Sequence, residues 1–193
     1  VLAASADTLV HYPMDQLENP VKNHGNATGS DAIPRLMTDA SLTTGVAGNG
    51  LRIFGMADGL TLEAPNFLDG KSCAVSVYFY PEHLLERMTL FCFYGKGNVT
   101  ISTQIENGRL QVRGPLNIGE ETAVHPFGPD MELNRWYHLL WSMDGTRWLV
   151  KLNGQPVLNL PATTVPGGAF ETERILIGNT YCPIVHERDR FVG

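Results

Sequence analysis

Hydrophobic positions along the chain fall into short segments that are rich in Val, Ile, Phe, Tyr and Trp and are bounded by Gly, Asn, Asp or Pro. This pattern predicts β-strands. The predicted strands are Leu9–Met14, Leu51–Phe54, Leu60–Glu63, Lys71–Tyr80, Leu90–Tyr94, Thr100–Ile105, Arg109–Arg113, Trp136–Met143, Arg147–Leu152, Gln155–Leu160 and Arg174–Ile177. The most helix-like segment, Pro81–Met88, lasts only about two turns, so we expect a connecting turn there.

Three dipeptides predict tight hairpins, because Asn, Asp and Gly accept the positive φ values that primed turns require. They are Asn107-Gly108, Asp144-Gly145 and Asn153-Gly154. Many antiparallel strands without crossover helices leave a sandwich or a barrel. Several strands are apolar on both faces, which favours an all-β, two-sheet antiparallel sandwich.

Two further expectations concern pairing and loops. We expect Leu90–Tyr94 to pair back on Lys71–Tyr80, which would make Cys73 and Cys92 neighbours, either disulfide-bonded or as buried thiols. Cys182 is then the odd cysteine. The polar stretch 19–49 predicts a long loop that carries one short strand around Ile33–Met37.

Composition and charge narrow the class of protein. A chain of 193 residues with 43% hydrophobic and 18% charged residues is typical of one globular domain, which we expect to cover 1–193. The formal net charge of −6, with only 14 scattered basic residues, argues against a nucleic-acid surface. No apolar run approaches the roughly 20 residues that cross a bilayer, so we expect no membrane insertion.

Two local features point to a secreted or cell-surface glycoprotein. Residues 1–6 resemble the end of a signal peptide, with an Ala-x-Ala site before Asp7, the alternative being an arbitrary chain boundary. Asn26-Ala27-Thr28 and Asn98-Val99-Thr100 are glycosylation sequons.

Residues 134–157 contain a specific spaced motif. Trp136 and His138 are followed by Asp144-Gly145, an apolar strand and Asn153-Gly154. This resembles the signature hairpin of the laminin-G-like, concanavalin A-like lectin/glucanase superfamily, in which Trp-x-His-Val-x-x-x-x-Asp-Gly precedes an apolar strand and Asn-Gly. Further segments match in the order of the family: Leu9–Asp15, Gly48–Gly55, Cys73–Pro81 and Ile175–Asn179. The resemblance implies a jelly-roll domain.

One departure from the family concerns the C-terminus. The family continues after a Phe-x-Gly motif with an Ile-Asp-Asp-like strand that closes the sheet beside the first strand, whereas this chain stops at Phe191-Val192-Gly193. We therefore expect the closing strand to be missing after residue 193 and to come from the remainder of the polypeptide or from a partner chain. Otherwise the first strand keeps an exposed edge.

The resemblance implies a non-catalytic, lectin-like or adhesive accessory domain of a larger secreted or surface protein, with a carbohydrate or glycoprotein as its ligand. Aromatic rings stack on sugars while polar groups bind the hydroxyls. The binding residues that we propose from sequence are Tyr94, Arg113, Trp148 and Tyr181. Tyr78 and Tyr80 belong to the same group of aromatic candidates.

Calcium is the metal that the resemblance implies, since family members hold one at a sheet rim through oxygen ligands. Asp15, Asn23, Asn26 and Asp31 can supply such oxygens, and ordinary turn residues are the alternative. The six His residues share no close zinc spacing.

Two alternatives to a carbohydrate-binding domain stay open. One is a structural domain that docks another protein. The other is a glycoside hydrolase with an unrecognised site, although the Glu-x-Asp-x-x-Glu motif of family glucanases is absent here. The nearest acid pairs, Glu120-Glu121 and Glu171 with Glu173, are more consistent with solvated strand ends, so we expect no catalysis by this domain.

Overall fold

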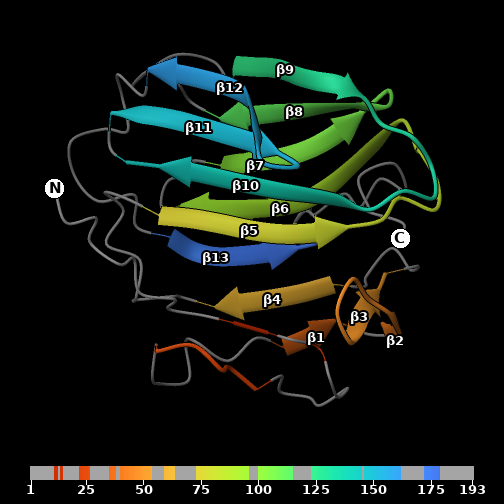
Figure 1. Cartoon of the computed structure of the whole chain (residues 1–193). Coiled ribbons are helices and arrows are strands. Elements are labelled where there is room, and N and C mark those ends of the chain that lie inside the picture. The colour runs from red at the N-terminus through yellow and green to blue at the C-terminus, as the bar shows by residue number, and fades with distance from the viewer. Residues whose placement is uncertain are drawn as a thin grey trace, which may run out of the picture.

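Two antiparallel sheets packed face to face dominate the structure (Figure 1). The computed structural model describes residues 11–12, 14, 22–26, 35–37, 40–53, 59–63, 73–95, 100–114, 123–144, 146–161 and 172–178. These residues form thirteen strands: β1 Arg35–Met37, β2 Ser41–Thr44, β3 Asn49–Arg52, β4 Gly59–Glu63, β5 Cys73–Phe79, β6 Arg87–Gly95, β7 Thr100–Glu106, β8 Arg109–Gly114, β9 Ala123–Asp130, β10 Tyr137–Met143, β11 Arg147–Leu152, β12 Gln155–Pro161 and β13 Thr172–Ile177. None of the described residues is helical, so the predicted all-β sandwich is confirmed.

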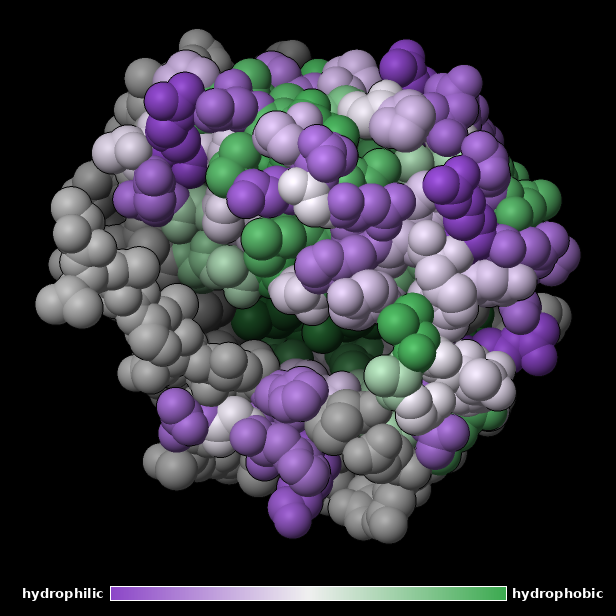
Figure 2. Space-filling model, viewed as in Figure 1, coloured by the Kyte–Doolittle hydropathy of each residue, from purple (hydrophilic) through white to green (hydrophobic). Residues whose placement is uncertain are grey.

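The larger sheet has the order β1-β4-β13-β6-β7-β8-β9, and the smaller has the order β12-β11-β10-β5. In Figure 1 the four-stranded sheet lies across β6 to β9, while β4 and β1 extend beyond it. Strands β2 and β3 form a separate hairpin. Figure 2, in the same view, shows polar side chains interspersed with smaller apolar areas, and a hollow below the middle that is lined by apolar side chains.

The core lies between the sheets because strand alternation sends every second side chain inward. On β10, Tyr137, Leu139, Trp141 and Met143 are buried while the residues between them are not. The Trp141 ring lies 5.6–5.8 Å from the rings of Phe91 and Phe93 on the opposite sheet and from Trp148 of β11. Burying one such aromatic contributes roughly 4–6 kcal/mol before entropy is counted.

Two of the predicted hairpins have the predicted turn geometry. Asn107 and Gly108 have φ values of 50° and 77°, and Asn153 and Gly154 have φ values of 50° and 80°. Each pair occupies the two central positions of a two-residue hairpin loop, which is the geometry of a type I′ turn.

The third reversal forms by a different means. Asp144 closes the turn by donating its backbone N–H to the Arg147 carbonyl at 3.2 Å, and its φ is not positive. Instead, its carboxylate oxygen Oδ1 accepts the backbone N–H groups of Thr146 and Arg147, each at 2.8 Å. The Thr146 hydroxyl also donates to Oδ1, at 2.7 Å. This bond, followed by those from the two backbone N–H groups, holds the pKa of Asp144 below its usual value. The Asp144 side chain thus stabilises the reversal, and Asp144 itself is not left-handed.

The expected pairing of β5 with β6 is wrong. Strand β5 pairs with β10, whereas β6 pairs with β7 and β13 in the opposite sheet. The connection between them therefore crosses from one sheet to the other. In this arrangement Phe79 of β5 and the aromatic residues of β6 face the core from opposite sides. Cys73 and Cys92 consequently lie in different sheets and are not cross-strand neighbours, and Cys182 lies outside the described residues.

The chain ends and loops differ in part from expectation. His11, Tyr12 and Met14 are not in a strand, and residues 9–10 lie outside the described part of the chain. The short strand expected near residue 35 is present as β1, but the β2–β3 hairpin in the same stretch was not expected.

Sequence reasoning also missed β9, because Pro126, Gly128 and Pro129 argue against a strand. Within the described sheet β9 is at the edge, where a missing N–H costs no ladder hydrogen bond.

Candidate functional site

The outer face of the seven-stranded sheet, which points away from the core, carries a row of polar side chains. In β7 the alternation TISTQIE turns Ile101 and Ile105 into the core. It places Gln104 and Glu106 on the outer face, where Gln104 is nevertheless buried, at 7% exposed. The following strand β8 turns Leu110 and Val112 inward in the same way. We call the outward residues that this register brings together the polar cluster: Arg87, Thr89, Gln104, Glu106, Gln111 and Arg113.

Register places these residues on adjoining strands. Gln104 of β7 is directly opposite Thr89 of β6 on one side and Gln111 of β8 on the other. Glu106 is likewise opposite Arg87. Cross-strand partners lie about 4.5–5.5 Å apart at Cβ, so the backbone alone brings these side chains within reach of one another.

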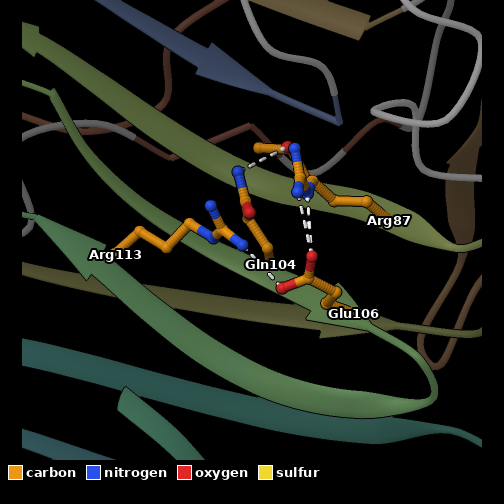
Figure 3. Close-up of polar contacts among 5 residues, drawn as sticks. Arg87, Gln104, Glu106 and Arg113 are labelled. Carbon is orange, nitrogen blue, oxygen red and sulfur yellow. Dashed lines mark hydrogen bonds and ion pairs between the residues drawn. The ribbon is translucent and has the colours of Figure 1, made fainter. Parts of the chain in front are cut away.

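Glu106 is held by two arginines (Figure 3). Its Oε1 accepts Nη2–H of Arg87 at 2.9 Å, and its Oε2 accepts Nη2–H of Arg113 at 2.6 Å. Figure 3 shows the two arginines reaching the carboxylate from neighbouring strands, with Gln104 between them. Gln104 donates its Nε2–H to Thr89 Oγ1 at 3.3 Å. The contacts order the guanidinium planes, which are the rigid donors of this face.

The charges of the cluster sum to +1, since two guanidinium groups share one carboxylate. The side chains of Arg87, Arg113 and Glu106 are 33%, 25% and 15% exposed. Burial raises the pKa of Glu106, but the hydrogen bonds and charges of Arg87 and Arg113 outweigh that effect and lower the pKa overall. Glu106 is therefore ionised at neutral pH and is unsuited to act as a proton donor.

Three buried polar atoms of the cluster have no hydrogen-bond partner within the described part of the chain: Gln104 Oε1, Gln111 Oε1 and Arg113 Nε. They comprise two acceptors and one donor on two neighbouring strands. Leaving one buried polar group unsatisfied costs about 1–3 kcal/mol, and native proteins pair nearly all of them. Hydroxyl groups can donate to amide oxygens and accept from a guanidinium nitrogen, and a ligand reaches these buried atoms only when their side chains rotate outward.

Two of the four residues proposed from sequence as sugar contacts share this outer face. Arg113 belongs to the polar cluster, and Tyr94 lies half-buried on β6, opposite Thr100 of β7. Strand spacing puts the two Cα atoms roughly 12 Å apart. The structure thus places Tyr94 and Arg113 on the same surface, at opposite sides of strand β7.

The other two do not join them. Trp148 is 1% exposed and packs edge-on against Trp141, so its ring is part of the core and offers no face to a ligand. Strand β11 turns Trp148 and Val150 inward and Arg147 outward. The sequence of one strand does not reveal which of its two faces is turned to the core. Tyr181 lies outside the described residues.

Sequence reasoning missed Arg87, Gln104, Glu106 and Gln111. The signal that was present is the alternation of polar and apolar residues in two strands joined by an Asn-Gly turn, which predicts one polar sheet face. It does not say whether that face holds a ligand or only contacts water.

The proposed calcium ligands are only partly described. Asn23 Oδ1 accepts the backbone N–H groups of His11 at 2.9 Å and Gly25 at 2.8 Å. Both lone pairs of that oxygen are therefore occupied, and Asn23 does not fit a cation ligand. Asn26 is exposed, and Asp15 and Asp31 lie outside the described residues. No group of three or more His, Cys, Asp or Glu side chains within the described ranges is placed to hold a metal ion. Calcium binding stays a prediction.

Comparison with protein families gives a match over residues 54–193 to the model described as the concanavalin A-like lectin/glucanases superfamily, a laminin-G-type model. No curated protein sequence matches the chain. Within the described residues there is no helix long and apolar enough to cross a bilayer.

Solved structures share the fold at low sequence identity. Domain 4 of AbnA, a GH43 extracellular arabinanase from Geobacillus stearothermophilus solved in complex with arabinotriose, is 16% identical with a TM-score of 0.74, over 96% of this chain and 87% of that chain. The receptor-binding domain of a botulinum neurotoxin C/D mosaic serotype is 15% identical, with a TM-score of 0.61 over 75% and 38% of the two chains. Domains LG4-5 of the mouse laminin alpha1 chain are 11% identical, with a TM-score of 0.59 over 81% and 42%. The chain spans less than half of the toxin and laminin chains.

Proposed function

This chain belongs to the concanavalin A-like lectin/glucanases superfamily, and from that premise we propose that it is a non-catalytic carbohydrate-binding domain whose ligand lies on the polar cluster. We further propose that it works in a secreted or surface protein. The extracellular arabinanase among the similar structures supports this location.

The observation that carries the proposal is the convergence of Gln104 Oε1, Gln111 Oε1 and Arg113 Nε as buried, unpartnered polar atoms on one sheet face. Water or a ligand has to satisfy them, and a sugar supplies both donors and acceptors on adjacent carbons. Each bond formed removes part of the 1–3 kcal/mol that an unsatisfied group costs. The glutamine pair is rigidly positioned, since both residues sit in the middle of paired strands.

The similar structures support a carbohydrate as the ligand class. The AbnA domain, which aligns over most of both chains, was solved with arabinotriose. Fold likeness at this identity does not transfer a binding site, so the polar cluster rests on its own geometry.

The arrangement of acids supports a non-catalytic role. Each described acid on this face is held by arginine: Glu63 pairs with Arg174 at 2.9 Å, Glu106 with Arg87 and Arg113 at 2.9 and 2.6 Å, and Asp130 with Arg109 at 3.1 Å. Glycoside hydrolases need two carboxyl groups about 5–9.5 Å apart, one of them with a raised pKa. The pKa of Glu106 is lowered instead.

The substitution Gln111→Leu tests the proposal. It removes an unsatisfied acceptor, so we expect stability to stay the same or rise by up to about 1 kcal/mol. Binding should weaken about tenfold, which corresponds to about 1.4 kcal/mol. Affinity is measured by isothermal titration calorimetry of the 193-residue chain with arabinotriose, xylotriose and cellotriose.

The matched control is Gln155→Leu, an exposed glutamine on β12 of the other sheet, which should bind as the wild type does. The proposal fails if Gln111→Leu keeps wild-type affinity. It also fails if none of the three sugars binds and a protein ligand does, which favours the interaction-domain alternative. Release of shorter sugars by the wild type would favour the hydrolase alternative.

A further inference from the structure

A second surface, on the opposite side of the sandwich, carries aromatic residues in two successive rungs. In the four-stranded sheet, Tyr78 of β5 is directly opposite His138 of β10. Continuing the same register puts Tyr80 opposite Trp136, about 7 Å further along the strands. We call these four residues, together with Ser76 on the preceding rung, the aromatic strip.

Alternation directs the strip outward. Phe79 and Tyr137, which lie between its members, are each only 4% exposed and stack on one another in the core. Tyr78 is 54% exposed and Trp136 is 37% exposed. They are two of only five large hydrophobic side chains exposed to this degree among the described residues.

The rings are ordered by contacts with each other. Tyr78 stacks on His138 with centroids 4.3 Å apart and planes inclined by 16°. Tyr80 and Trp136 contact at 5.2 Å and 49°. Ser76 Oγ lies 2.8 Å from His138 Nε2, which fixes the imidazole. One face of Tyr78 is covered by His138, so the exposed part of the ring is held in a fixed orientation.

We propose that the aromatic strip is a second carbohydrate site, selective for neutral sugars. Rigid, partly exposed aromatic rings pair with the C–H face of a sugar ring, and the tyrosine hydroxyls, Ser76 and His138 can bind its hydroxyl groups. This inference goes beyond the proposed function and does not depend on the polar cluster.

The aromatic strip itself contains no Asp, Glu, Lys or Arg side chain that would bind a charged sugar, whereas the polar cluster carries +1. The lysine of the neighbouring strand β11, Lys151, lies beyond Leu140 of β10. Arg135, which adjoins Trp136, is already paired with Glu132 at 3.1 Å and lies over the Tyr137 ring at 5.7 Å. The small residue Ala74 is exposed on the rung beyond Ser76, opposite Ser142. A sugar chain can therefore continue along β5 without meeting a bulky side chain there.

The location of the two sites has a consequence for binding. The two sites lie on opposite outer faces of one sandwich, so a single domain would hold two sugar segments at once. Two weak sites on one molecule raise the overall avidity for a multivalent polysaccharide.

Tryptophan fluorescence separates the two sites. Trp141 and Trp148 are 0% and 1% exposed, so acrylamide quenches mainly Trp136. The sugars tested are arabinotriose, xylohexaose and cellohexaose, each at about 10 mM, which saturates a site with a Kd near 1 mM. We expect at least one of them to reduce acrylamide quenching of the wild-type chain at least twofold. Tyr78→Ala should weaken this protection about tenfold, and its far-UV circular dichroism should match the wild type because the ring is exposed.

Two controls make the outcome decisive. Leu133→Ala removes another exposed apolar side chain outside the strip and should leave protection unchanged. Gln111→Leu should also leave it unchanged, so a failure of the polar cluster is distinguished from a failure of the strip. The inference is overturned if no sugar of the panel protects Trp136, if Tyr78→Ala is protected like the wild type, or if Trp136 is shielded only by self-association at higher protein concentration.

Discussion

Glu106 shows how one side chain can link three strands. It lies on β7 and binds Arg87 of β6 and Arg113 of β8 at 2.9 and 2.6 Å. The carboxylate neutralises one of two guanidinium groups that would otherwise repel each other on a partly desolvated surface. The same contacts orient the Arg113 guanidinium that we assign to the ligand.

Glu106→Gln should lower the free energy of unfolding by about 1–3 kcal/mol at pH 7, because two charge-assisted hydrogen bonds are weakened. The folded-state pKa of Glu106 is below its ordinary value of 4.5. The stabilisation is therefore complete above pH 4.5 and is lost as the pH falls through the lower folded-state pKa. Urea unfolding of both proteins between pH 7 and pH 3 measures the difference. A constant difference over that range would contradict this account.

The two Asn-Gly hairpins share their turn geometry and a backbone bond to the preceding strand, since Asn107 donates its N–H to the Glu86 carbonyl at 2.9 Å. They differ in a side-chain bond. Asn107 and Asn153 both have a φ of 50°. Asn153 also accepts the His138 backbone N–H on its Oδ1 at 2.9 Å and donates its own N–H to the His138 carbonyl at 2.8 Å. The β11–β12 turn is thereby tied to the start of β10, next to the aromatic strip.

Asn153→Ala should therefore destabilise the protein more than Asn107→Ala. Both variants force Ala into a left-handed conformation, at a cost of about 1–2 kcal/mol. Only Asn153→Ala also leaves the His138 N–H without its side-chain acceptor, which adds about 1 kcal/mol. Urea midpoints of the two variants give the comparison, and equal midpoints would show that the side-chain bond contributes nothing.

At the scale of the whole molecule, Trp141 joins the two sheets. It comes from the four-stranded sheet and contacts Phe91 and Phe93 of the seven-stranded sheet. Those two aromatics support the inner side of β6, whose outer side carries Arg87 and Thr89 of the polar cluster. The position of the cluster thus depends on how the sheets pack.

Trp141→Ala should cost about 3–5 kcal/mol, because it leaves a large cavity between the sheets. Domains are stable by only about 5–15 kcal/mol, so the urea midpoint should fall steeply. Trp136→Ala, which removes an exposed indole of the same strand region, should change stability by about 1 kcal/mol at most. Similar losses for the two variants would show that Trp141 does not join the sheets as described.

The features that depend on neighbouring residues could be predicted from the sequence. Short apolar segments bounded by turn residues predicted β10 and β11, and Asn-Gly pairs predicted two type I′ turns, because both depend on residues close together in the chain. The polar face that holds Tyr94 and Arg113 follows from the alternation of polar and apolar residues.

Long-range packing decided the rest. The phase that buries Trp148, the crossing from β5 to β6 that separates Cys73 from Cys92, and the edge position that tolerates Pro126 depend on which strands meet across the sandwich. The aromatic strip likewise joins residues of β5 and β10, which are distant in sequence. The polar cluster joins three consecutive strands, whose register follows from their pairing in the sheet. The sequence by itself determined most of the strands, two of the tight turns and the family, since these follow from short-range rules. Only the tertiary structure decided which side chains face each other, because strand pairing and core packing depend on the whole chain at once.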